Sequence, residues 1–169
     1  MRTRLNVYLS ANIRYVYRFV KQKILAWTFD NESAMHIHLW PYKAIYMGVS
    51  PDNDVHAHHA VQICIGLDKD ISVQDYRAQS IHTGQCIVIF EDVPHKLFAQ
   101  AGQIVVIYLE PEDRQNQQFL TALRQARSDG INTLPLKGKD LGSISQQLFT
   151  DVDIEKLWKT VNEAIGLVY

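Results

Sequence analysis

The sequence has little cysteine and no long apolar run, and each absence excludes a class of protein. Its 169 residues include two cysteines, Cys64 and Cys86, and no CxxC pair. A zinc ribbon and a thioredoxin-like redox pair are therefore excluded. No apolar stretch approaches the roughly 20 residues that a membrane-spanning helix needs, and no secretory signal is visible. We expect a protein of the reducing cytoplasm that does not enter a membrane.

The sequence also lacks an excess of charge of either sign. It has 17 Lys and Arg against 18 Asp and Glu, for a formal net charge of −1. Binding to a nucleic-acid duplex depends on several contacts between basic side chains and phosphates. We therefore expect that this chain alone binds no nucleic acid. Its 47% of hydrophobic residues is ordinary for a globular protein that buries a core without disulfides.

Residues 1–34 differ from the rest because their basic residues all precede the first acidic residue, Asp30. Apolar residues recur there at the three- and four-residue spacing of a helix. This stripe consists of Ile13, Val16, Tyr17, Val20 and Ile24. Three interpretations stay open: a helix packed on the rest of the protein or on a partner subunit, a non-native extension before a natural start at Met35, or a targeting or membrane-surface helix.

Residues 35–110 change to a period of two. The segments that carry it are short, rich in Val, Ile and aromatic residues, and separated by turn residues. They are His36–Trp40, Ile45–Val49, Ala60–Gly66, Ile71–Arg77, Cys86–Glu91, His95–Ala99 and Gln103–Leu109. Short, closely spaced strands are typical of an antiparallel sandwich or barrel. Residues 104–109 are apolar on both faces and should be buried from both sides.

Residues 111–169 change again, to a helical pattern. We expect one helix over 112–127 that stops before Gly130, a second over 141–149, and a third from Asp153 to Gly166. The third helix has an apolar stripe of Ile154, Leu157, Trp158, Val161 and Ile165. Together with Leu148 and Phe149, this is more apolar surface than the barrel can cover. A surplus apolar patch marks an interface, so we expect these helices to build a homodimer.

Histidines are concentrated in the predicted strand region. His56 and His58 stand two residues apart, so on an extended chain they share a face while His59 points away. Two adjacent imidazoles can bind one divalent ion. Gln62 has the same parity, but it lies about 13 Å beyond His58 at roughly 3.3 Å per residue. It can join the pair only if the chain bends between His59 and Val61.

The string His56-Ala57-His58-His59-Ala60-Val61-Gln62 resembles the first cupin motif, in which HxH is followed after three residues by Glu. The span from Gly84 to His95 reproduces the spacing of the second motif, a Gly followed after ten residues by His. The departures are Gln62 for Glu, Phe90 for Pro, Asp92 for Gly, Ala99 for Asn and Ser50 for the leading Gly. The resemblance implies a mainly β fold: a small antiparallel cupin (jelly-roll) barrel, followed here by C-terminal α-helices. It also implies that His56, His58 and His95 lie inside the barrel.

A narrower resemblance concerns function. The stretches HAHHAVQICIGLDKD, EDVPHKL and VVIYLEPE are similar to the sensory barrel of AraC/XylS-type transcription regulators, over roughly residues 36 to 165. The resemblance implies a barrel that binds a small-molecule effector and helices that support dimerisation. In that family a helix-turn-helix region follows. Nothing before Tyr169 resembles one, so the chain is similar to a truncated regulator or to a stand-alone sensor.

The four candidate metal ligands are His56, His58, Gln62 and His95. Three imidazoles and an amide oxygen suit Zn²⁺, Ni²⁺, Mn²⁺ or Fe²⁺. The alternative is that these side chains line a polar pocket and hydrogen-bond an organic ligand or water. Gln62 weakens the metal interpretation because a neutral amide offsets none of the charge of the ion.

Sensing and catalysis make different demands on the rest of the pocket. For an effector pocket we expect Cys64, Phe90 and Tyr108 as wall residues. The alternative is a metal-dependent cupin enzyme, a dioxygenase or isomerase that uses the ion as a Lewis acid or to orient its substrate. The motifs hold no carboxylate ligand and no acid/base pair, so sensing is favoured and no catalytic residue is assigned.

Overall fold

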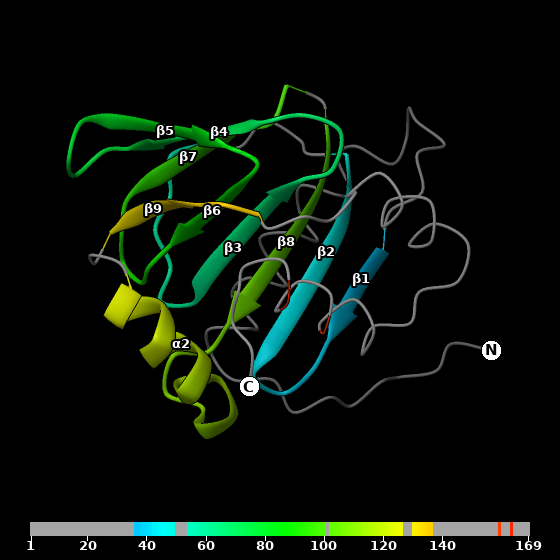
Figure 1. The fold of residues 1–169 in the computed structure, drawn as a ribbon, viewed down its shortest axis with the longest axis vertical. Coiled ribbons are helices and arrows are strands. Elements are labelled where there is room, and N and C mark those ends of the chain that lie inside the picture. The colour runs from blue at the N-terminus through cyan, green and yellow to red at the C-terminus, as the bar shows by residue number, and fades with distance from the viewer. Residues whose placement is uncertain are drawn as a thin grey trace.

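The computed structural model describes residues 36–49, 54–100, 102–126 and 130–136, together with residues 159 and 163. Within these ranges the chain forms nine strands and one helix, and the strands make two antiparallel sheets (Figure 1). The mainly β fold class expected from the sequence is confirmed. No helix of the described part of the chain has the length and apolarity to cross a bilayer.

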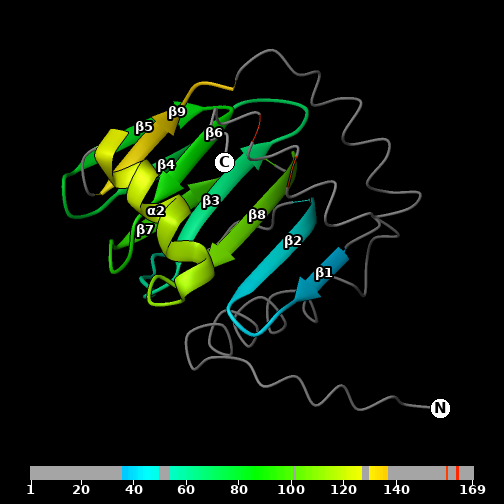
Figure 2. The ribbon, with the colours of Figure 1, turned by 60° about the horizontal axis from the view of Figure 1, so that its bottom comes forward.

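The larger sheet has six strands and the smaller has three (Figures 1 and 2). The order in the larger sheet is β1 (His36–Leu39), β2 (Lys43–Val49), β8 (Gln103–Leu109), β3 (Val61–Gly66), β6 (Cys86–Ile89) and β9 (Ile131–Leu134). The order in the smaller sheet is β5 (Ser80–Gly84), β4 (Ile71–Asp75) and β7 (His95–Phe98). Helix α2 (Arg114–Ala126) lies against the outer face of the larger sheet.

Alternation along the strands divides the core into two layers. One layer lies between the two sheets, where β4 contributes Ile71 and Val73 and β3 contributes Cys64. The other lies on the outer face of the larger sheet, where Phe119 of α2 packs and where Cys86 is found. Residues 104–109 of β8 are buried on both faces, as the sequence predicts, because alternate residues enter the two layers.

Two strands lie where the sequence pattern predicts none. Strand β5 occupies 80–84, between the predicted segments Ile71–Arg77 and Cys86–Glu91, and it pairs with β4 along its whole length. Strand β9 lies inside the region 111–169, which was predicted to be helical. It pairs with β6 and buries Ile131 and Leu134, so residues beyond the predicted barrel boundary complete the larger sheet.

Helix α2 confirms the first helix predicted after residue 110. Gly130 follows it with a φ of 113°, a conformation that glycine adopts without strain. The second and third predicted helices lie outside the described residues, apart from residues 159 and 163, and so does the extension over 1–34. The domain boundaries and the homodimer therefore stay predictions.

Candidate metal centre

The two histidine motifs meet through main-chain hydrogen bonds. His56 and His95 form an isolated antiparallel bridge, in which His56 N donates to His95 O at 3.0 Å and His95 N donates to His56 O at 2.9 Å. Asp92 N also donates to His58 O at 2.9 Å. The segment before β3 is thereby paired with the segment that leads into β7.

A bend brings Gln62 to the same place. Residues 59 and 60 form a bend before β3 begins at Val61. As a result Oε1 of Gln62 lies 2.8 Å from Nε2 of His58, although the two residues are four apart in the sequence. This is the bend between His59 and Val61 that Gln62 needs in order to join the histidines.

The three imidazoles lie against one another. One ligand atom from each of His56, His58 and His95 lies within 4.8 Å of the other two. The ring centroids of His56 and His95 are 4.4 Å apart, and those of His58 and His95 are 5.2 Å apart. The structure thus brings all four candidate metal ligands together, with Gln62 attached through His58.

The orientation of each ring is set by its Nδ1 atom. Each Nδ1 faces a backbone carbonyl oxygen two residues away: His56 that of Asp54 at 2.8 Å, His58 that of Ala60 at 2.8 Å and His95 that of Val93 at 2.7 Å. A carbonyl oxygen only accepts hydrogen bonds, so each Nδ1 carries a proton and, in a neutral ring, each Nε2 presents a lone pair. This tautomer and this support by a carbonyl are usual for histidines that bind metal through Nε2.

Burial keeps two of the rings neutral. Burial, and after it the charges of the neighbouring His56 and His58, lower the pKa of His95 to about 3. Burial likewise lowers the pKa of His58. His95 is 1% exposed, and its Nε2 is buried without a hydrogen-bond partner. A buried lone pair without a partner beside two further imidazoles and an amide oxygen fits a divalent transition metal.

The three residues predicted as pocket walls are divided between the two core layers. Cys64 and Tyr108 lie between the sheets. The Cys64 sulfur accepts a hydrogen bond from Gln62 Nε2 at 2.9 Å, and the Tyr108 ring lies 5.5 Å from that of His58. Phe90 instead belongs to the outer layer, with the guanidinium of Arg124 5.4 Å from its ring centroid. Phe90 lies two residues after Val88, which itself lies two residues after Cys86, so on an extended chain all three side chains point to the outer layer.

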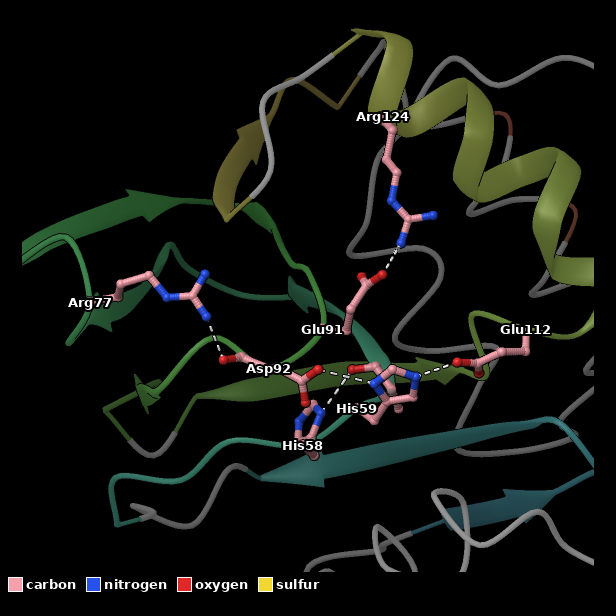
Figure 3. Close-up of polar contacts among 8 residues, drawn as sticks. His58, His59, Arg77, Glu91, Asp92, Glu112 and Arg124 are labelled. Carbon is pink, nitrogen blue, oxygen red and sulfur yellow. Dashed lines mark hydrogen bonds and ion pairs between the residues drawn. The ribbon is translucent and has the colours of Figure 1, made fainter.

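A further cluster, not predicted from the sequence, surrounds His59 (Figure 3). Its Nδ1 lies 3.1 Å from the Asp92 carboxylate and its Nε2 contacts the Glu112 carboxylate. Hydrogen bonds to Glu112 and then to Asp92 raise the pKa of His59 to about 9. A hydrogen bond from Glu110, and then one from His59, lowers the pKa of Glu112. The sequence gives one local indication of this cluster: His59 points away from the face that His56 and His58 share.

Comparison with known proteins gives similarity in structure only. No protein-family model matches the chain, and no curated protein matches it. An RmlC-like cupin family protein with a double-stranded β-helix fold from Methanocaldococcus jannaschii is 11% identical, with 48% of this chain and 84% of that chain covered and a TM-score of 0.40. An RmlC-like cupin from Shewanella frigidimarina is 14% identical, with 52% and 91% covered and a TM-score of 0.39. ToxT from Vibrio cholerae is 9% identical, with 78% and 51% covered and a TM-score of 0.39.

The arrangement of the chain itself agrees with the sequence motifs. Two antiparallel sheets enclose a core, and the HxH segment and the Gly84–His95 segment meet through the bridge between His56 and His95. The chain has the cupin-type barrel that these two motifs predict.

Proposed function

We propose that the barrel binds a divalent metal through His56, His58, Gln62 and His95, and that a small-molecule effector binds at this metal. The observation that carries the proposal is the buried Nε2 of His95, which has no hydrogen-bond partner. A buried polar atom without a partner costs about 1–3 kcal/mol. A metal ion would satisfy this lone pair together with the lone pairs of the adjacent rings.

The bound metal would supply a coordination position for an oxygen or nitrogen donor of the effector. The residues of the chain fix the imidazoles, and the apolar layer between the sheets provides the surroundings. Cys64 and Tyr108 are the nearest candidates for contacts to an effector, because they contact Gln62 and His58 respectively.

The protonation chemistry of these neighbours supports binding over catalysis. A general acid or base works best with a pKa near the operating pH. Burial raises the pKa of Cys64 to about 12, and burial raises the pKa of Tyr108 well above its usual value. Gln62 is neutral at any physiological pH. These neighbours therefore bind and orient, and the enzymatic alternative lacks a proton-transfer group among them.

The resemblance of the sequence to AraC/XylS-type sensory barrels supports the finer proposal of a sensor for transcription regulation. The buried cysteines Cys64 and Cys86 are both free thiols, which suits the reducing cytoplasm in which we propose that it acts.

Cobalt binding tests the proposal, because Co²⁺ replaces Zn²⁺ at such sites and its visible spectrum reports its ligands. Full-length protein without a histidine tag is dialysed against Co²⁺, and bound ions are counted. We expect His95→Gln to bind one ion fewer than wild type, whereas the matched change His82→Gln on β5 binds the wild-type number. Acetate, as a small oxygen-donor probe, should shift the spectrum of the ion that His95→Gln loses. Equal binding by His95→Gln and wild type would overturn the metal site, and a spectrum insensitive to acetate would overturn the effector site.

A further inference from the structure

We infer that His59, Glu110 and Glu112 form a second divalent-metal site, separate from the three-histidine cluster. One ligand atom from each of these residues lies within 4.8 Å of the other two. His59 comes from the bend before β3, whereas the two glutamates flank the turn between β8 and α2. A cation at this point would join segments that are 53 residues apart in the chain.

The orientation of His59 favours a cation at its Nε2 atom. Asp92 holds Nδ1 at 3.1 Å from its carboxylate oxygen, and Nε2 is directed at Glu112 on the other side of the ring (Figure 3). A carboxylate that accepts from Nδ1 and leaves Nε2 for the ion is the usual support of a metal-binding histidine. Asp92 would thus orient the ligand without binding the metal.

The backbone around the two glutamates is fixed by hydrogen bonds. Glu110 is 5% exposed, and its N donates to the carbonyl oxygen of Tyr42 at 2.9 Å. The buried side chain of Asn116 donates to the carbonyl oxygen of Glu110 at 2.9 Å. Asp113 caps α2 by accepting from the N of Gln115 at 3.0 Å. The carboxylates therefore extend from a backbone that is already ordered.

The two glutamates also lie close to each other. One carboxylate oxygen of Glu110 and one of Glu112 lie within 4.8 Å of each other and of a ring nitrogen of His59. Two carboxylates this close repel unless a proton or a cation lies between them. Glu110 is nearly buried, so water screens this repulsion poorly. A divalent ion would compensate both charges at once.

The ligand chemistry identifies the class of ion. One imidazole nitrogen and two carboxylate oxygens suit Zn²⁺ and its transition-metal neighbours, whereas Mg²⁺ and Ca²⁺ take oxygen ligands. His59 is 36% exposed and Glu112 is 64% exposed in their side chains, so an ion can reach the site from solvent. The site would tie α2 to the segment that carries His58.

Zinc binding by five forms of the chain tests this inference separately from the three-histidine site. Equilibrium dialysis against Zn²⁺ should give one ion fewer for Glu112→Gln than for wild type. His95→Gln should lose a different ion, and the double variant should bind two fewer than wild type. Asp70→Asn, which removes the same charge from an exposed residue beyond the far end of β3, should bind as wild type does.

Thermal unfolding gives a second measurement that does not depend on counting ions. Zn²⁺ should raise the Tm of His95→Gln and leave the Tm of the double variant unchanged, because an ion that binds only the folded state stabilises it. His59→Gln should repeat the effect of Glu112→Gln. Wild-type zinc binding by both Glu112→Gln and His59→Gln would overturn the second site, whatever His95→Gln does.

Discussion

Nε2 of His58 and Oε1 of Gln62 lie 2.8 Å apart, and both atoms present lone pairs when the imidazole is neutral. Ala60 O holds the proton of His58 on Nδ1, and Cys64 holds the amide nitrogen of Gln62 on the other side. A cation bound by both lone pairs would make this close approach of Nε2 and Oε1 favourable. Without a cation, the flipped orientation of the Gln62 amide would be favoured, in which the amide nitrogen donates to Nε2 of His58.

Gln62→Glu should strengthen metal binding by about tenfold, or about 1.4 kcal/mol, because a carboxylate offsets charge that an amide does not. Equilibrium dialysis of Zn²⁺ in competition with a chelator measures the affinity. The control is Gln74→Glu, the same change on the half-buried strand β4, which should leave the affinity unaltered. Unchanged affinity in Gln62→Glu would place Gln62 outside the metal site.

The metal-free protein should lose stability as the pH falls from about 6.5 toward 3. The unfolded chain takes up protons on His58 and His95 near the ordinary pKa of 6.5, whereas burial lowers both pKa values in the folded chain, that of His95 to about 3. The unfolded state thus binds more protons in this window, so the free energy of unfolding decreases with decreasing pH.

Urea unfolding in the presence of EDTA at several pH values measures this dependence. In His95→Leu the slope should become shallower by up to about 1.4 kcal/mol per pH unit. Equal slopes for the variant and wild type would show that His95 titrates alike in the folded and unfolded chains.

Both thiols should be unreactive in the folded protein. Burial raises the pKa of Cys64 and of Cys86 to about 12, and the thiolate is the reactive form. We expect each to react with Ellman's reagent at least about 1000-fold more slowly than a free cysteine. In urea, both cysteines should react at the rate of a free cysteine. A fast Cys64 without denaturant would reveal an opening between the sheets, and a fast Cys86 would reveal an opening in the outer core layer.

Arg124→Ala should destabilise the protein by about 1 kcal/mol. The guanidinium pairs with Glu91 and lies over the Phe90 ring, and both charged side chains are partly exposed. The substitution also leaves the carboxylate of Glu91, whose Oε2 has no hydrogen-bond partner, without its cation. Thermal or urea unfolding measures the change. Arg114→Ala, at an exposed position at the start of α2, should stay within about 0.5 kcal/mol of wild type.

The parts of the barrel that depend on residues close together in the sequence could be predicted from it. The uninterrupted apolar run of residues 104–109 predicts a strand buried on both faces, and the parity of His56 and His58 predicts two rings on one side. The same rule assigns Phe90 to the outer layer once β6 is continued by one residue. For Phe90, therefore, the local pattern indicates the outer layer and not the wall of a pocket between the sheets.

Other features depend on partners that are distant in the sequence. Strand β9 has four residues, and its neighbour β6 decides that they are extended. The contacts of His59 come from residues 33 and 53 positions away. The spacing around His59 contains neither partner, so local pattern could not assign that cluster. In both cases, contacts with residues distant in the sequence determine the structure, and the local pattern does not.

The contacts between Nδ1 and backbone carbonyls in the three-histidine cluster also orient the rings before an ion binds. Each contact spans only two residues, so every ring is oriented by its own short loop. The rotational freedom of the rings is lost during folding, before any ion arrives. Ion binding should therefore involve little reorientation of the three imidazoles, and these rings should be nearly equally ordered in occupied and ion-free barrels.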